Sequence, residues 1–218
     1  MGLLVAVHVV TALVEWGHGL ATLREGLVLE RDLRFRVSVG GQYHPLVAAG
    51  EVWRLWTSVL LHVDLLHLTL NGAALYALGR VLEPWVGGLR LLAWFLAGGL
   101  VGSMVAYLFE VTHSDGASGG VFALLAAAIV LGWELRDRMP GPDRRVVGPW
   151  LWGLLLLNLV LSAVVPSIDL SAHLGGLGMG LVLAGGIGLW RHRVVRWVEA
   201  AWVLGYALTC AVGWSVSS

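Results

Sequence analysis

Residues 118–134 read SGGVFALLAAAIVLGWE, an apolar run that meets its first charged residue only at the end. A stretch of this kind is suited to crossing the hydrocarbon core of a bilayer as a helix. Similar runs recur along the chain, which has 218 residues, 58% of them hydrophobic and 13% charged. We predict seven membrane spans, at residues 2–21, 60–79, 88–109, 118–134, 149–166, 171–190 and 197–215.

The pattern predicts an all-α polytopic membrane protein built as one helical bundle. Most connections between the predicted spans are short, so consecutive helices should pack antiparallel. The exception is the first loop, residues 22–59. A connection of that length usually has structure or a function of its own. Its mixture of apolar residues, tryptophans and arginines suits a segment that lies at the membrane interface.

The basic residues are all arginines, and they indicate how the bundle is oriented. They fill the connections after the second, fourth and sixth spans, and they are absent from the third and fifth connections and from the tail. Short cytoplasmic loops collect positive charge, so the N-terminus is predicted to be cytoplasmic and the C-terminus outside. The first loop also holds five arginines and would then lie outside, but a loop of that length need not obey this rule. The formal net charge is zero, which gives no support to nucleic-acid binding. The compact, lysine-free chain suggests a prokaryotic inner membrane.

Polar side chains inside a membrane are costly and usually mark function. The second span carries His62, His67 and Asn71 within ten residues. His67 and Asn71 are four residues apart, so they project from the same face of a helix, and both can donate hydrogen bonds. A single such residue is often a packing feature, but three together favour a functional role.

Ser118 stands at the start of the fourth span in the sequence DGASGGVF, residues 115–122. Gly116 and Gly119 remove steric cover from its hydroxyl, and the free amides at the start of a helix can stabilise an anion. A serine by itself is more often a packing residue in a membrane helix. To act as a nucleophile, Ser118 needs a base from another part of the chain.

His173, in the stretch SAHLGGLGMG, is the candidate base. Its span runs in the same direction as the span of Ser118, so the two residues are predicted at a similar depth near the outer side. A serine activated by a nearby imidazole is the minimal nucleophile for acyl transfer. Asp169 lies four residues before His173 and is predicted to cap the helix, so the sequence indicates a Ser-His dyad. His67 and Asn71 come to a comparable level and can supply oxyanion donors.

Taken together, these residues resemble the rhomboid family of intramembrane serine proteases. The resemblance runs from about residue 51 to residue 180, and no single motif in it would be specific alone. Its motifs are the WR pair Trp53-Arg54, HxxxxHxxxN at His62, His67 and Asn71, GxxxExxxG at Gly79, Glu83 and Gly87, GxSG at Gly116, Ser118 and Gly119, and AHxxGxxxG at Ala172, His173, Gly176 and Gly180.

The resemblance implies a rhomboid-like six-helix bundle over residues 1–196, including the loop 22–59, plus one additional C-terminal transmembrane helix at residues 197–218. It implies Ser118 as nucleophile and His173 as general base. The amide of Ser118 and the side chains of His67 and Asn71 would form the oxyanion hole. The supporting positions are His62, Gly116, Gly119, Phe122, Trp53, Arg54 and Glu83; Phe122 stands where many members have tyrosine.

The implied activity is serine endopeptidase cleavage of peptide bonds in or near transmembrane segments. The implied partners are single-pass or polytopic membrane-protein substrates and the lipid bilayer, with no cofactor, no metal and no nucleic acid. Members of the family cleave near the top of a transmembrane segment, and access depends on movement of the fifth helix and of a loop that caps the site.

Three alternatives compete with this interpretation. The first is a non-catalytic rhomboid-like protein that binds membrane clients, although such relatives generally lack the serine or the histidine. The second is a small transporter or proton-conducting bundle that uses His8, Glu15, His67 and Glu199. The third, a zinc protease, is weaker because the chain has no HExxH motif.

Overall fold

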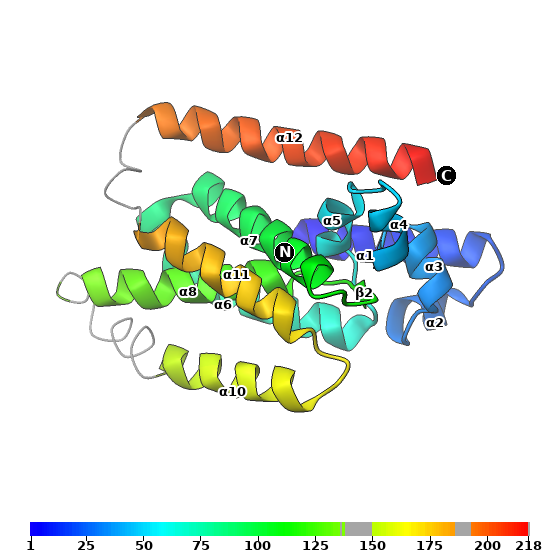
Figure 1. The fold of residues 1–218 in the computed structure, drawn as a ribbon, viewed down its shortest axis with the longest axis horizontal. Coiled ribbons are helices and arrows are strands. Elements are labelled where there is room, and N and C mark those ends of the chain that lie inside the picture. The colour runs from blue at the N-terminus through cyan, green and yellow to red at the C-terminus, as the bar shows by residue number, and fades with distance from the viewer. Residues whose placement is uncertain (136, 138–149, 186–192, 218) are drawn as a thin grey trace.

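The structure is a computed structural model in which residues 1–135, 137, 150–185 and 193–217 are described. Figure 1 shows elongated helices running roughly side by side, with a group of short elements gathered at one end. The start of the predicted span 149–166 and the end of the predicted span 171–190 lie outside the described residues. Seven long helices form the bundle in the described part of the chain: α1 (Gly2–Gly17), α6 (Leu65–Val86), α7 (Gly88–Leu108), α8 (Ser118–Leu135), α10 (Leu151–Val164), α11 (Leu170–Gly185) and α12 (Arg193–Ser217).

The second of these helices, α6, differs most from its predicted range of 60–79. It begins at Leu65 because the Asp64 side chain accepts a hydrogen bond from the backbone amide of His67, at 2.6 Å, and caps the helix. It continues to Val86 and ends at Gly87, whose φ of 83° breaks the helix. Hydropathy alone does not detect a cap, and the polar residues of its last turns hid the true end.

Glycines bring α7, α8 and α11 together at the centre of the bundle. A side chain on Gly176 would place its Cβ 2.0 Å from the carbonyl oxygen of Gly119, and one on Gly180 would lie 2.2 Å from that of Ala123. A Cβ on Gly102 would lie 2.7 Å from the carbonyl oxygen of Ala172. Because neighbouring backbone fills these spaces, only glycine fits there. These contacts form what we call the glycine seam.

The outer helices expose large apolar side chains. On α10, Leu156 is 65% exposed and Val164 66%; on α12, Leu204 is 65% exposed and Leu208 66%. By length and apolar composition, α6 and α7 are long enough to cross a membrane, and four further apolar helices are shorter. Apolar surface of this extent on several helices suits contact with lipid chains.

The first loop folds into short elements of its own, as its length led us to expect. They are α2 (Leu23–Val28), α3 (Leu33–Ser38), α4 (His44–Ala48), α5 (Arg54–Thr57), a 3₁₀ turn (Ser58–Leu60) and the two-residue strand β1 (Gln42–Tyr43). β1 pairs antiparallel with β2 (His113–Ser114), just before α8. The sequence predicted an all-α fold and did not reveal this short ladder. The ladder joins the loop to residues 113–117, which lead into Ser118 and which we call the serine segment.

The last helix, α12, packs against α7 and against the first loop (Figure 1). The Tyr206 hydroxyl donates to the carbonyl of Trp56 at 2.7 Å, and the Trp214 indole donates to that of Val39 at 2.6 Å. Gly213 lies against the Trp53 ring, where a Cβ would come within 2.4 Å. The seventh helix therefore holds the loop in place from the side.

Candidate active site

Ser118 is the first residue of α8 and is half-buried. Each of the three residues from 114 to 116 is fixed to a different element. The Ser114 hydroxyl donates to Asp169 at 2.6 Å, the Asp115 carboxylate pairs with Arg36 at 2.7 Å, and the Gly116 amide donates to the carbonyl of Ser58 at 3.0 Å. The segment that leads into Ser118 is thereby held by α11, α3 and the 3₁₀ turn.

The ion pair between Asp115 and Arg36 is almost completely buried, with side chains 1% and 6% exposed. The other oxygen of Asp115 accepts the backbone amide of Gln42 at 3.0 Å. Burial raises the pKa of the Asp115 carboxyl, and the adjacent Arg36 guanidinium opposes the rise. This pair could not be predicted from the sequence, because its members lie 79 residues apart.

His173 lies in the first turn of α11 with 7% of its surface exposed. Its ring stacks on that of Phe122, with ring centroids 4.1 Å apart and planes 15° apart. Phe122 lies one turn after Ser118 on α8, and Gly176, three residues after His173, touches the backbone of Gly119. The structure therefore brings the first turns of the two helices together and orders the imidazole between them.

Asp169 caps α11, as predicted, by accepting the amide of Ala172 at 3.0 Å. The same oxygen accepts the Ser171 hydroxyl, and the other accepts that of Ser114. Both oxygens of this carboxylate are thus engaged in bonds other than to His173.

Ser162, on α10, contacts the His173 ring and was missed by the sequence analysis. Its hydroxyl oxygen lies 2.7 Å from Nδ1 of His173, and the side chain is buried. It also donates to the carbonyl of Asn158 in its own helix, at 2.6 Å. A serine in an apolar helix carries no signal that separates such a contact from ordinary packing.

His67 lies beside the serine segment. The left-handed backbone of Gly116, with φ of 139°, faces the His67 ring, and a Cβ on Gly116 would come within 2.6 Å of it. His62 is 1% exposed and meets His67 edge to face, with ring centroids 5.1 Å apart. Asn71 is 6% exposed and donates to the carbonyl of His67 at 3.0 Å. His67 thus contacts the segment before Ser118, and His62 and Asn71 each contact His67.

The remaining supporting residues lie further from Ser118. Arg54 is 4% exposed and binds Glu51, at 2.7 Å, together with the carbonyls of Val37 and Gly41. Its guanidinium also lies over the Trp53 ring, so the WR pair braces the first loop. Glu83 lies near the other end of α6, exposed, beside the turn into α7.

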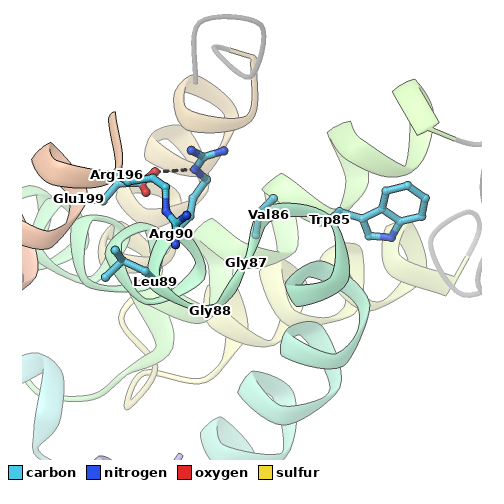
Figure 2. A pocket seen from close by; sticks show the side chains of 8 residues that line it. All are labelled: Trp85, Val86, Gly87, Gly88, Leu89, Arg90, Arg196 and Glu199. Carbon is cyan, nitrogen blue, oxygen red and sulfur yellow. Dashed lines mark hydrogen bonds and ion pairs between the residues drawn. The ribbon is translucent and has the colours of Figure 1, made fainter. Parts of the chain in front are cut away.

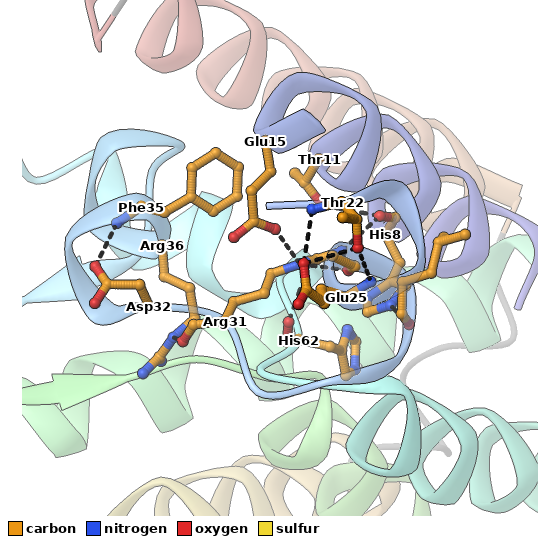
Figure 3. A network of polar contacts seen from close by, with 12 residues as sticks. His8, Thr11, Glu15, Thr22, Glu25, Arg31, Asp32, Phe35, Arg36 and His62 are labelled. Atoms are coloured by element: carbon orange, nitrogen blue, oxygen red, sulfur yellow. Dashed lines mark hydrogen bonds and ion pairs between the residues drawn. The ribbon is translucent and has the colours of Figure 1, made fainter. Parts of the chain in front are cut away.

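A second polar network lies between α1 and the first loop (Figure 3). Buried Arg31 donates to the carbonyls of His8, Gly26 and His62, and lies 3.6 Å from the Glu15 carboxylate. The His8 ring bonds to the carbonyl of Leu27 in the loop.

On α12, Glu199 pairs with Arg90. The ionisable residues that suggested a transporter therefore make local structural contacts, which weakens that alternative.

The pocket in Figure 2 lies at the turn between α6 and α7, beside the start of α12. It has a volume of about 340 Å³. Its walls include Trp85, Arg90 and Glu199, and none of the residues at Ser118 or His173 contributes to it. Within the described residues, no three His, Cys, Asp or Glu side chains gather as a metal site would require.

The chain is similar to one protein family and to several curated proteins. The family model of the Rhomboid domain matches residues 49–190. Rhomboid protease GluP of Bacillus subtilis (strain 168) is 35% identical over 153 residues, which cover 70% of this chain and 29% of that protein. RHOMBOID-like protein 5 of Arabidopsis thaliana is 31% identical over 167 residues, covering 74% of this chain and 52% of that protein.

Rhomboid-like protease 1 of Toxoplasma gondii is 30% identical over 176 residues, covering 78% of this chain and 59% of that protein. In each of these three alignments the chain spans less than two thirds of the relative's own length. Because these relatives come from Bacillus subtilis, Arabidopsis thaliana and Toxoplasma gondii, the similarity does not support the prokaryotic source that the sequence analysis suggested.

Proposed function

Because this chain belongs to the rhomboid family and is thus an integral membrane protein, we propose that it is an intramembrane serine endopeptidase with Ser118 as nucleophile and His173 as general base. The observation that carries the proposal is the stack of His173 on Phe122, one turn from Ser118, between helices whose backbones touch. An imidazole ordered against the helix turn that begins with Ser118 supports a role in activating that serine for acyl transfer.

The proposed reaction proceeds in two steps. Nε2 of His173 accepts the proton of the Ser118 hydroxyl, and the serine oxygen bonds to the scissile carbonyl carbon. The carbon–nitrogen bond breaks, and the amine leaves with the proton from His173. Water then loses a proton to His173 and attacks the acyl carbon; the bond to the serine oxygen breaks, that oxygen regains the proton from His173, and the acid is released.

The proposed oxyanion hole consists of the Ser118 amide, at the start of α8, and the side chains of His67 and Asn71. The contact between the His67 ring and Gly116 supports this role, because it brings the ring within two residues of the nucleophile. Donors fixed before the reaction stabilise the developing charge without reorganising. His62, packed edge to face on His67, would hold that ring in place.

The proposed substrates are membrane proteins with a transmembrane segment that unwinds near the site, because the peptide bonds of an intact helix are shielded. The proposed orientation has the N-terminus in the cytoplasm and the C-terminus outside, as the arginine distribution predicts. Ser118, His173 and the first loop would then face outward. Cysteine accessibility on the two sides of sealed vesicles would test the orientation.

The decisive experiment for the proposed function uses purified protein and a test substrate with one transmembrane segment. Wild type should cleave the substrate, and Ser118→Ala and His173→Ala should each abolish cleavage while remaining folded. Undiminished cleavage by Ser118→Ala would overturn the assignment of the nucleophile. A wild-type protein that binds such a segment without cleaving it would instead support the non-catalytic client-binding alternative.

A further inference from the structure

The hydroxyl of Ser162 has two polar neighbours, and its single proton decides how each bond is made. One neighbour is the carbonyl oxygen of Asn158, at 2.6 Å, which can only accept a hydrogen bond. The other is Nδ1 of His173, at 2.7 Å, which donates or accepts according to the tautomer. Both bonds form only if Ser162 gives its proton to Asn158 and accepts one from His173.

The same proton count fixes the tautomer of the His173 imidazole. A neutral ring carries one proton, so a proton on Nδ1 leaves the lone pair of Nε2 free to act as a base. In serine hydrolases with a triad, a carboxylate bonded to Nδ1 keeps the histidine in this tautomer. Here the carboxylate nearest in sequence, Asp169, already serves Ser114, Ser171 and the start of α11.

Two contacts together determine the orientation of the His173 ring. Stacking on Phe122 fixes the plane of the ring, and the bond to Ser162 fixes how the ring is turned within that plane. The two partners come from different helices, α8 and α10. Neither contact alone would define the direction of Nε2.

We propose that Ser162 is a positioning residue, which holds His173 with its proton on Nδ1 and its Nε2 directed for proton transfer. This role rests on the proposed function, since it presupposes that His173 acts as the base for Ser118. A neutral hydroxyl is a weaker orienter than a carboxylate, because hydrogen bonds to charged groups are the stronger ones. The loss of Ser162 should therefore slow the reaction without abolishing it.

The first test compares Ser162→Ala with Ser162→Thr in detergent-solubilised full-length protein. The measured quantity is the rate constant for labelling of Ser118 by a fluorophosphonate. It is normalised to the fraction of the protein that becomes labelled. We expect Ser162→Ala to lower this rate about five- to tenfold, as for the loss of one neutral hydrogen bond. Ser162→Thr keeps a hydroxyl and should retain most of the wild-type rate. An unchanged rate in Ser162→Ala would overturn the proposal.

The control variant is Thr209→Ala on α12, whose hydroxyl donates to the carbonyl of Gly205 at 2.9 Å. It removes the same kind of intrahelical bond far from His173, so its labelling rate should match wild type. A general loss of stability would lower the labelled fraction and the melting temperature instead. If Thr209→Ala slowed labelling as much as Ser162→Ala, the effect would not be specific to His173.

The second test reads the tautomer directly. In protein labelled with ¹⁵N in the histidine rings, the signals of His173 are assigned by their loss in His173→Gln. Wild type should show the proton on Nδ1, and Ser162→Ala should show a mixture of tautomers. A wild-type proton on Nε2 would overturn the proposal even if Ser118 is labelled normally. Failure of wild type to be labelled at all would instead overturn the proposed function, and with it the positioning role.

Discussion

The glycine seam and the first loop bring distant parts of the chain together in different ways. In the seam, α8 and α11 meet backbone to backbone, and no side chain separates Gly176 from Gly119. In the first loop, long arginine side chains span the gaps, and Arg31 and Arg36 are held by carbonyls and carboxylates. The first kind of contact depends on shape alone, whereas the second depends on charge.

The difference explains how the candidate site is built. The seam fixes the helices that carry Ser118 and His173, because backbones packed this closely cannot shift without a steric clash. The loop fixes the residues before Ser118 through Asp115, and the backbone at His62 through Arg31. We infer that changes in the seam abolish the fold, whereas changes in the loop alter the placement of the serine segment.

Replacing Gly176 with alanine should have the largest effect of all, because its Cβ would collide with the carbonyl of Gly119. Neither backbone can move without separating α8 from α11, so we expect most of the protein not to fold, a larger effect than the loss of about 1–3 kcal/mol that is typical of an overpacked core. The matched control is Gly178→Ala on the same helix, where a Cβ meets nothing within 4 Å. Thermal unfolding in detergent measures both; equal melting temperatures would contradict the account of the seam.

Breaking the buried pair of the loop should have the next largest effect. Arg36→Met leaves Asp115 buried without its partner, and we expect a loss of about 3–5 kcal/mol of stability. Adding Asp115→Leu removes the stranded charge, so the double variant should recover much of that loss. Glu110→Gln, at an exposed carboxylate, is the control. A double variant as unstable as Arg36→Met alone would show that charge is not what the loop depends on.

Asn71→Ala removes a proposed oxyanion donor and should affect turnover more than stability. The Asn71 amide donates to the carbonyl of His67, and other proposed oxyanion donors remain when it is removed. Turnover should fall by an amount equivalent to about 2–4 kcal/mol of transition-state stabilisation at most. Thr69→Ala, on an exposed face of the same helix, should leave turnover unchanged. Normal turnover in Asn71→Ala would remove this residue from the oxyanion hole.

The smallest effect is expected where the seventh helix supports the first loop. Tyr206→Phe removes the bond to the carbonyl of Trp56 and keeps the ring, so stability should fall by about 0.5–1.5 kcal/mol. Melting temperatures of this variant and of Thr209→Ala, whose hydroxyl bonds within α12, would show whether α12 supports the loop or only lines the membrane. If Thr209→Ala lost as much stability as Tyr206→Phe, α12 would only line the membrane and would not support the loop.

The helices were predictable because each is a long apolar run, and hydropathy detects such runs wherever they lie. The start of α6 was not, since it depends on the cap of Asp64. The capping role of Asp169 could be inferred from residue type and spacing, and the roles of Ser118 and His173 stay predictions. The contacts of Ser162 and Asp115 could not, because each is made with a residue of another element, across 11 and 79 positions of sequence.

The central claim is that Ser118 is a nucleophile activated by His173. Its most direct test is to treat the purified protein with a fluorophosphonate and to map the modified residue by mass spectrometry. The account predicts one modified residue, Ser118, and no modification in His173→Ala. Modification of a different serine, or labelling of Ser118 at the wild-type rate without His173, would contradict it.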